Sequence, residues 1–322
     1  MQYKKIVILG TGGTIAGLAS SASALGGNIS YTAAQIGVDQ LVSAVPALAG
    51  AGDITFEQIA QIDSKDMTFA VWTHLADRVQ HHLVQDDVGG LVITHGTDTL
   101  EETAYFLQTV INPVKPVVLT CAMRPADALA PDGPQNMLDA VTVARYPGAQ
   151  GVVAVCAGVI HGALDVQKTH TYQLNAFGSG DAGAIGFIEE NSLKLIRKWP
   201  VAQQIRALKA PEIIAKLNSA EFWPRVEIVM NYAGASGELV DALVASGVRG
   251  LVVAGTGNGT LHHALEAALL RAQSQGVRTV RSTRCAQGRV LQKADDLFPA
   301  FDGLSPVKSR IALMLQLMGI AA

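Results

Sequence analysis

Residues 4–17 read "KKIVILGTGGTIAG", in which an apolar run passes directly into glycines and threonines. The apolar part is continuous rather than alternating, which is typical of a strand buried on both faces of a sheet. Similar runs follow along the chain, and amphipathic helical stretches such as 100–111 separate them. This alternation predicts an open α/β fold with a mostly parallel sheet and helices on both sides. With 4–9, the predicted strands are 91–95, 116–121, 151–156, 226–232, 250–254 and 277–282.

Two domains are predicted from where this alternation stops and resumes. It fails over 191–224, a stretch that contains three prolines and no strand–loop–helix motif. We therefore predict a large N-terminal catalytic α/β domain at 1–197 and a connecting segment at 198–224. A smaller C-terminal α/β domain, also with a parallel sheet, is predicted at 225–322.

Composition limits the class of protein. Apolar residues make up 49% of the 322 residues and charged residues 16%, so a sizeable core is expected. The net charge of −3 and the lack of a basic stripe argue against a nucleic-acid partner. The apolar runs are too short for a membrane span or a signal peptide, so we expect a cytoplasmic protein. The three widely spaced cysteines suit reduced thiols, and the histidines and cysteines lack metal-ligand spacing, which predicts no catalytic metal.

Several predicted strands end in small and polar residues. In an open α/β sheet, ligands bind outside the carboxyl ends of the strands. Three of these ends fall in the predicted N-terminal domain, so we expect them to form one site. The four strand ends are 10–14, 94–98, 121–125 and 255–259.

The first strand end does not match a phosphate-binding loop. Ile15 stands where the dinucleotide fingerprint needs its third glycine, and no lysine follows as in a Walker loop. Two interpretations remain open from the residues alone: a glycine turn whose threonines satisfy backbone groups, or a turn that carries a reactive threonine. The segment 19–27, of mostly small residues, follows directly and is predicted to be a mobile lid.

The stretch 93–107, "ITHGTDTLEETAYFL", also has two interpretations. Asp98 and Thr99 each precede a glutamate by three residues, which favours ordinary helix capping. Alternatively, Thr97 and Asp98 lie where a helix begins beside a strand end, a place that suits a carboxylate or a developing oxyanion. Lys168 is by itself an ordinary loop lysine, although a lysine beside a threonine hydroxyl activates it.

Five motifs occur in order between residues 11 and 259: "TGGTIAG", "VITHGTDTLEETAYF", "KPVVLTCAMRP", "DGPQN" and "TGNG". Together they closely resemble the bacterial-type L-asparaginase/glutaminase family. The resemblance implies a two-domain α/β fold and hydrolysis of a side-chain amide to a carboxylate and ammonia through an acyl-enzyme. It also implies a small-molecule substrate, a homotetramer built as a dimer of intimate dimers, and no metal or organic cofactor.

The resemblance also implies roles for the residues that match the family's motifs. Thr14 is similar to the primary nucleophile, and Tyr31 to the tyrosine that activates it. Thr97, Asp98 and Lys168 are similar to the second threonine with its acid and lysine partners. An alkyl hydroxyl is a poor nucleophile without such neighbours. Which threonine attacks first stays open; we favour Thr14 because the glycines around it give access.

The same resemblance implies the substrate contacts. Ser64 and Asp98 are similar to the groups that hold the α-carboxylate and α-amino group of the substrate. Lys65 and Gly96, which lie close to them in the sequence, are also expected to bind the substrate. By resemblance, the backbone around Ala122 forms part of the pocket for the amide oxygen. Backbone N–H groups near Thr97 and Ala122 are expected to hold the oxyanion.

Three departures from the family pattern bear on substrate choice. Lys65 stands where the family commonly has Gln, and Thr260 where many members have Asn. In the segment "RSTRCAQGRVLQKADD" no glutamate matches the family's acidic residue, and Asp295 and Asp296 are poor substitutes. An added cation and a missing anion would both weaken recognition of an α-ammonium group.

Two alternatives follow for Lys65: it alters specificity, or it points to solvent or pairs with Asp63 or Asp66. Two other functions stay open. One is a weakly active amino-acid-binding or sensor protein, suggested by the departures at 65, 260 and 295. The other is a nucleotide-dependent enzyme, which the missing third glycine opposes.

Overall fold

The computed structural model divides the chain into two compact units. The larger comprises Met1–Ile205 with Lys209–Asn218, and the smaller comprises Arg206–Leu208 with Ser219–Ala322. Apart from Ala19, the predicted lid lies outside the described residues. The structure describes residues 4–19, 31–50, 52–200 and 208–320.

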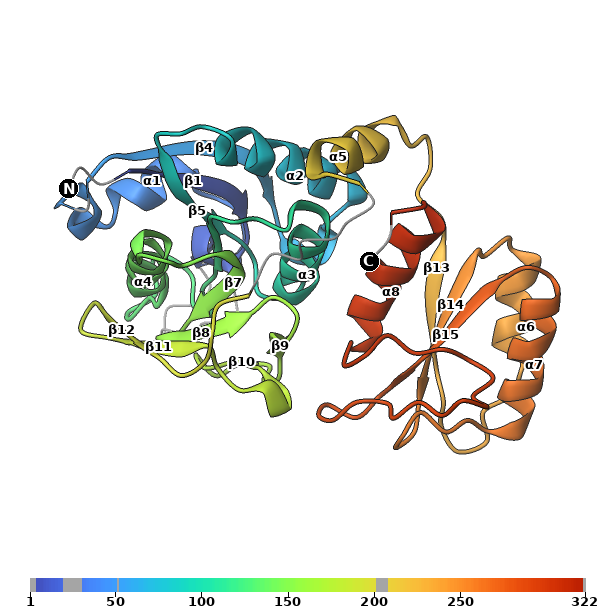
Figure 1. Cartoon of the computed structure of the whole chain (residues 1–322). Coiled ribbons are helices and arrows are strands. Elements are labelled where there is room, and N and C mark those ends of the chain that lie inside the picture. Colours follow the sequence, from blue (N-terminus) through green and yellow to red (C-terminus); the bar gives the residue numbers. More distant parts are fainter. Residues whose placement is uncertain (1–3, 20–30, 51, 201–207, 321–322) are drawn as a thin grey trace. The chain divides into compact units, whose positions relative to one another are not determined.

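The larger unit is built on an eight-stranded sheet (Figure 1). Its strands are β1 (Lys5–Gly12), β4 (Ile54–Ile62), β5 (Val88–Thr94), β6 (Pro116–Thr120), β7 (Gly151–Cys156), β8 (Val159–Gly162), β11 (Gly186–Glu189) and β12 (Ser192–Leu195). Their spatial order is β12-β11-β8-β7-β6-β5-β1-β4. The five strands from β7 to β4 run parallel, and β8, β11 and β12 add an antiparallel edge. The prediction of a mostly parallel sheet is confirmed.

Burial explains which strands could be predicted. All residues of β6 and β7 are buried, as a continuous apolar run requires. β4 borders the sheet, and its residues are half-buried or exposed. In the sequence, β4 therefore does not stand out as a continuous apolar run, although this strand ends two residues before Ser64.

Helices cover both faces of this sheet. α2 (Phe69–Leu83) and α3 (Leu100–Ile111) lie on one face, and α1 (Val38–Ser43) and α4 (Gly133–Arg145) lie on the other (Figure 1). The range of α3 matches the prediction, but the helix is buried on nearly all sides rather than amphipathic. It packs on β7 and beside α2, where Phe106 stacks on Trp72 with ring centroids 5.0 Å apart.

Two short hairpin-like pairs place side chains near the carboxyl end of the sheet. β2 (Leu18–Ala19) pairs with β3 (Tyr31–Thr32), which fixes the backbone of Tyr31 beside the turn that follows β1. β9 (Gln167–Lys168) pairs with β10 (Phe177–Gly178), which fixes the backbone of Lys168.

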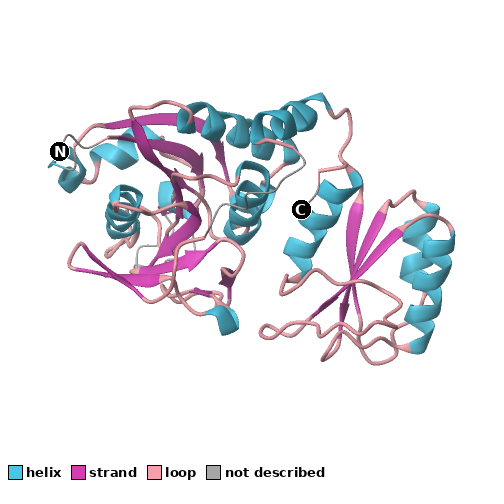
Figure 2. Cartoon of the chain, in the orientation of Figure 1, coloured by secondary structure: helices cyan, strands magenta, loops and turns pink. Residues whose placement is uncertain are grey.

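The smaller unit has a three-stranded parallel sheet in the order β13-β14-β15. α6 and α7 pack on one face and α8 on the other (Figure 2). The three strands predicted for this region are confirmed. Its elements are β13 (Val226–Met230), α6 (Glu238–Ala245), β14 (Gly250–Gly255), α7 (His263–Ser274), β15 (Arg278–Thr283) and α8 (Pro306–Leu317).

The stretch 191–224, for which no strand–loop–helix motif was predicted, contains β12 and a helix, α5 (Ala210–Ser219). The connecting segment predicted at 198–224 thus includes a helix. Pro211 stands in the first turn of α5, where its missing N–H costs no hydrogen bond. Most of α5 belongs to the larger unit.

Candidate active site

The ends of β1 and β5 meet where the order of the sheet changes direction. β4 and β5 lie on opposite sides of β1, so the chain order reverses between β1 and β5, a usual place for ligand binding. Gly13 has a φ of +82°, and a Cβ added to it would lie 2.3 Å from the Cα of Gly96. Glycine is therefore required for this close approach. It brings the loops that carry Thr14 and Thr97 into direct contact.

Thr14 begins a short 3₁₀ turn after β1, and only 6% of it is exposed. Its Oγ1 lies 2.7 Å from the Oη of Tyr31. The other threonine of this motif, Thr11, lies in β1 and donates its hydroxyl to the carbonyl of Thr94 at 2.9 Å. Thr11 is thus occupied in holding β1 to β5, whereas Thr14 has a phenol oxygen as its partner.

The second threonine has a cationic partner. The Nζ of Lys168 donates to Thr97 Oγ1 at 2.8 Å and to Asp98 Oδ1 at 2.5 Å. An ammonium group this close favours the deprotonated form of the hydroxyl. The sequence placed these residues about seventy positions apart, and the structure brings them together.

The capping interpretation of this stretch is wrong. Thr99 occupies the N-cap of α3, yet its side chain makes no capping hydrogen bond within the described residues. Instead, its hydroxyl donates to the carbonyl of Ser64 at 2.8 Å, and the carboxylate of Asp98 faces Lys168. The polar side chains therefore point into the site and not back along the helix.

Ser64 lies in the turn after β4 and is buried. Its Oγ accepts the backbone N–H of Asp98 at 3.2 Å. A Cβ added to Gly96 would lie 2.4 Å from the same Oγ. The residues predicted to hold the substrate, Ser64, Gly96 and Asp98, thus form one cluster next to Thr97.

Ala122 follows β6 and is buried. Among the described residues, no hydrogen bond engages its backbone N–H or carbonyl, or the backbone N–H of Thr97. The loop after Ala122 is tied to the Thr14 loop, because the N–H of Ala126 donates to the carbonyl of Gly17 at 2.9 Å. The backbone N–H groups at both predicted oxyanion positions are therefore not engaged within the described part of the chain.

Sequence reasoning missed His95, which supports the Gly96 loop. Its Nδ1 lies 2.7 Å from the Gly96 carbonyl, and its Nε2 lies 2.9 Å from the Thr103 hydroxyl, which also accepts the indole N–H of Trp72. Burial lowers the pKa of His95 to about 4, so the ring is neutral at pH 7. The available signal was a histidine directly after a continuous apolar strand.

His95 predicts a loss of stability in acid. The ordinary pKa of His is about 6.5, so below that value the unfolded chain binds a proton that the folded chain excludes down to about pH 4. We expect His95 to lower the free energy of unfolding by about 3 kcal/mol over this interval. Urea unfolding at several pH values checks this. His95→Gln should show a shallower pH dependence, and the exposed control His74→Gln should match the unsubstituted protein. Equal slopes in all three would contradict it.

Comparison with known proteins gives the family. The family models described as "Asparaginase, N-terminal" and "Glutaminase/Asparaginase C-terminal domain" match residues 5–201 and 225–319. The chain belongs to the asparaginase family. It is an asparaginase-type amidohydrolase.

Individual relatives cover nearly the whole of this asparaginase-family chain. L-asparaginase 2 of Bacillus subtilis is 38% identical over 97% of the chain and 82% of the relative, and L-asparaginase 2 of Escherichia coli is 39% identical over 98% and 90%. Glutaminase-asparaginase of Pseudomonas fluorescens is 36% identical over 98% and 87%. The crystal structure of a probable cytoplasmic L-asparaginase from Campylobacter jejuni is similar with a TM-score of 0.87 and 37% identity, covering 98% of this chain and 95% of that one.

The departures from the asparaginase pattern have structural partners of their own. Lys65 Nζ lies 2.8 Å from Asp63 and 3.1 Å from Asp66, and these carboxylates raise its pKa. Its side chain is 61% exposed. Thr260 bonds to Thr256 across a tight turn. The carboxylate of Asp296 accepts the N–H of Lys293 at 2.8 Å and is paired with Arg281.

The cysteines of this asparaginase-family chain are free thiols. Cys121 and Cys156 are buried with their sulfurs 3.1 Å apart. The neighbouring Cys156 and burial both raise the pKa of Cys121, so its nucleophilic thiolate is disfavoured. This environment opposes a cysteine nucleophile.

The helices and the metal-binding side-chain types bear on other partners. None of the helices in the described ranges is long and apolar enough to cross a membrane. Within the same ranges, no group of three or more His, Cys, Asp and Glu side chains is arranged to hold a metal ion.

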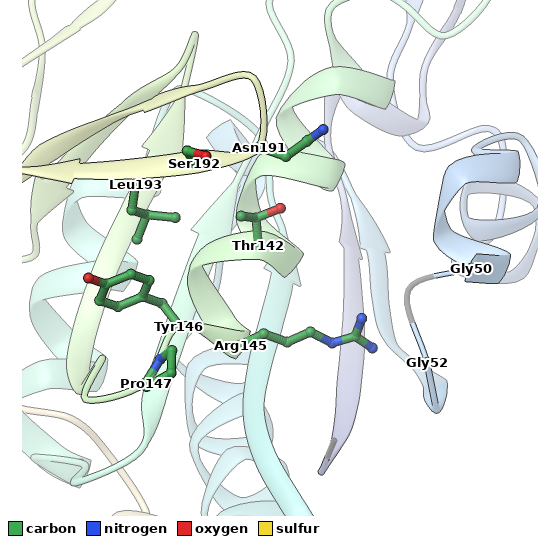
Figure 3. Close-up of a pocket in the computed structure, with 9 residues that line it drawn as sticks. All are labelled: Gly50, Gly52, Thr142, Arg145, Tyr146, Pro147, Asn191, Ser192 and Leu193. Atoms are coloured by element: carbon green, nitrogen blue, oxygen red, sulfur yellow. The ribbon is translucent and has the colours of Figure 1, made fainter. Parts of the chain in front are cut away.

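A cavity of about 690 Å³ lies apart from the residues predicted to act in catalysis. It is lined by α4, by β12 and by the glycines Gly50 and Gly52 (Figure 3). Arg145 extends from α4 toward Gly52. None of the predicted site residues lines this cavity.

Proposed function

We propose that this chain hydrolyses the side-chain amide of L-asparagine to aspartate and ammonia through an acyl-enzyme, with L-glutamine as a weaker substrate. One observation carries the proposal: two threonine hydroxyls with different activating partners meet at the switch point of the sheet. Thr14 has Tyr31 at 2.7 Å, and Thr97 has Lys168 at 2.8 Å. Relatives named L-asparaginase and glutaminase-asparaginase support the substrate class.

In the first step, Thr14 Oγ1 attacks the amide carbon. Its proton leaves through the hydrogen bond to Tyr31 and reaches the departing nitrogen, which becomes ammonia. The product of this step is an ester between the substrate acyl group and Thr14. In the second step, water attacks the ester near Thr97 and Lys168, aspartate leaves, and the Thr14 hydroxyl regains a proton.

The negative charge on the tetrahedral oxygen needs preorganised donors. The unengaged backbone N–H groups of Thr97 and Ala122 are suited to this role, since they require no reorganisation. One such donor typically contributes about 10²–10³-fold to kcat. Ser64 and Asp98 are proposed to hold the α-carboxylate and α-amino group, because they lie together beside Thr97.

The ion pairs of Lys65 favour ordinary recognition of asparagine. Asp63 and Asp66 offset its charge, and its side chain is mostly in solvent. We therefore expect Lys65→Gln to change kcat/KM for L-asparagine by less than about threefold, as for an exposed ion pair. Steady-state ammonia release from both proteins checks this. A gain of tenfold or more would instead support the altered-specificity alternative.

A substrate panel with ammonia detection tests the proposed function. It contains L- and D-asparagine, L-glutamine, and N-acyl and β-aspartyl compounds. We expect L-asparagine to have the highest kcat/KM. If the protein binds L-asparagine but releases no ammonia from any compound, it is instead an amino-acid-binding or sensor protein.

We also propose that the protein is a cytoplasmic homotetramer with domains at 1–197 and 225–322 joined by 198–224. The matches of the two family models to 5–201 and 225–319 support these boundaries. The relatives include both a cytoplasmic and a periplasmic protein. Light scattering is expected to give four times the chain mass of 33.7 kDa. A stable active monomer would contradict the assembly.

A further inference from the structure

The motif "DGPQN" at 132–136 begins α4 and takes no part in the proposed chemistry. We infer that Asp132 and Asn136 are positioning residues that fix the backbone of Ala122, so that its peptide groups face the reacting amide. The inference rests on the proposed function for its catalytic consequence. The positioning itself rests on the contacts of the loop at 121–124.

Asn136 joins the ends of two strands. It is almost completely buried, and its Nδ2 donates to the carbonyl of Cys121 at 2.9 Å. Its Oδ1 accepts the N–H of Ala157 at 2.9 Å, directly after β7. The same Nδ2 lies 3.2 Å from Asp132 Oδ2, which ties the two motif residues together. Each end of the carboxamide thus holds a different strand end in place.

Asp132 uses both carboxylate oxygens on the same loop. Oδ2 accepts the N–H of Met123 at 3.0 Å, and Oδ1 accepts the N–H of Arg124 at 3.0 Å. An Asp before a helix normally accepts N–H groups of that helix, but Asp132 makes no side-chain capping bond to α4 among the described residues. Its carboxylate is therefore directed at the loop rather than at its own helix.

The two residues hold Ala122 from both sides. The preceding carbonyl, of Cys121, and the following N–H, of Met123, are both engaged. The N–H and carbonyl of Ala122 itself have no partner within the described part of the chain. One end of each peptide unit that flanks the Cα of Ala122 is therefore fixed, and the Ala122 N–H stays unengaged, as a donor to an oxyanion requires.

Gly133 lies close to the residue that follows the proposed nucleophile. A Cβ added to it would lie 2.9 Å from Ile15 Cγ1 and 3.5 Å from the Cβ of Ala122. Ile15 directly follows Thr14 in the chain. The start of α4 therefore touches both the Thr14 turn and the Ala122 loop, and it sets the distance between them.

Two isosteric variants test the inference. Asp132→Asn puts an NH₂ group opposite a backbone N–H, and Asn136→Asp removes the donor to Cys121. The control Gln135→Ala changes an exposed residue in the same helical turn that bonds to Asp139 and not to the loop. The readouts are amide hydrogen exchange at 122–124 in the unliganded protein, and kcat and KM for L-asparagine.

We expect both variants, but not the control, to speed exchange at 122–124 by about tenfold or more and to lower kcat by about tenfold or more. KM should stay within about threefold, because Ser64 and Asp98 lie on other loops, which follow β4 and β5. The inference is overturned if exchange is unchanged, or if Gln135→Ala speeds exchange and lowers kcat as much as the two variants do. Faster exchange without a loss of kcat overturns the catalytic part. If the unsubstituted protein releases no ammonia, the proposed function fails, while the exchange data still decide the positioning.

Discussion

Thr14→Ala is expected to lower kcat for L-asparagine by about four orders of magnitude, because it removes the atom that forms the acyl-enzyme. The variant should fold normally, since only one methyl group and one hydroxyl, with its hydrogen bond to Tyr31, are lost. Ammonia release under saturating substrate measures the effect, and binding of L-aspartate reports that the site is intact.

Thr11→Val provides the matched control for this variant. Thr11 lies three residues earlier, at the end of β1, and its hydroxyl donates to the Thr94 carbonyl. Valine preserves its shape and leaves that carbonyl without its donor, which costs about 1–3 kcal/mol of stability. We expect kcat to stay within about threefold. If Thr11→Val and Thr14→Ala lose activity equally, the loss does not identify the Thr14 hydroxyl as the nucleophile.

Lys168→Met is expected to lower kcat by about 10²–10³-fold. The substitution keeps much of the apolar stem but removes the ammonium that bonds to Thr97 and Asp98. Asp98 is 51% exposed, so water solvates its carboxylate when the lysine is gone and the fold should survive. Single-turnover kinetics separates formation of the acyl-enzyme from its hydrolysis, and we expect the second step to slow more.

Lys194→Met serves as the control for the loss of a lysine charge. Lys194 is exposed on β12, and it is not a predicted site residue. The activity of the Lys194→Met variant should equal that of the unsubstituted protein. A kcat for Lys168→Met within about threefold of this control would show that Thr97 needs no cation.

The buried strands of the sheet were predictable because their signal is local. A strand covered on both faces must be continuously apolar, as β6 and β7 are. The edge strand β4 lacks that pattern, since one side of its backbone has no neighbouring strand. The range of α3 was predicted correctly, but its contact with α2 through Phe106 and Trp72 is not evident from the sequence of α3 alone.

The partners of polar side chains were the least predictable part of the site. The spacing of Asp98 and Thr99 to later glutamates fits a capping box, yet these side chains bond to Lys168 and Ser64. Asp132 likewise precedes a helix and bonds to a loop instead. A short polar side chain can reach local or distant partners equally well, so spacing alone does not choose between them. The family motifs indicated which residues distant in the sequence act together, and helix-capping propensities carry no such information.

The central claim is that Thr14 carries the acyl group during turnover. Rapid acid quenching of the enzyme with saturating L-asparagine, followed by peptide mapping with mass spectrometry, tests it most directly. The account predicts an aspartyl ester on Thr14 in the peptide that contains residues 11–17. An ester on Thr97 instead, with Thr14 unmodified while ammonia is released, would contradict it.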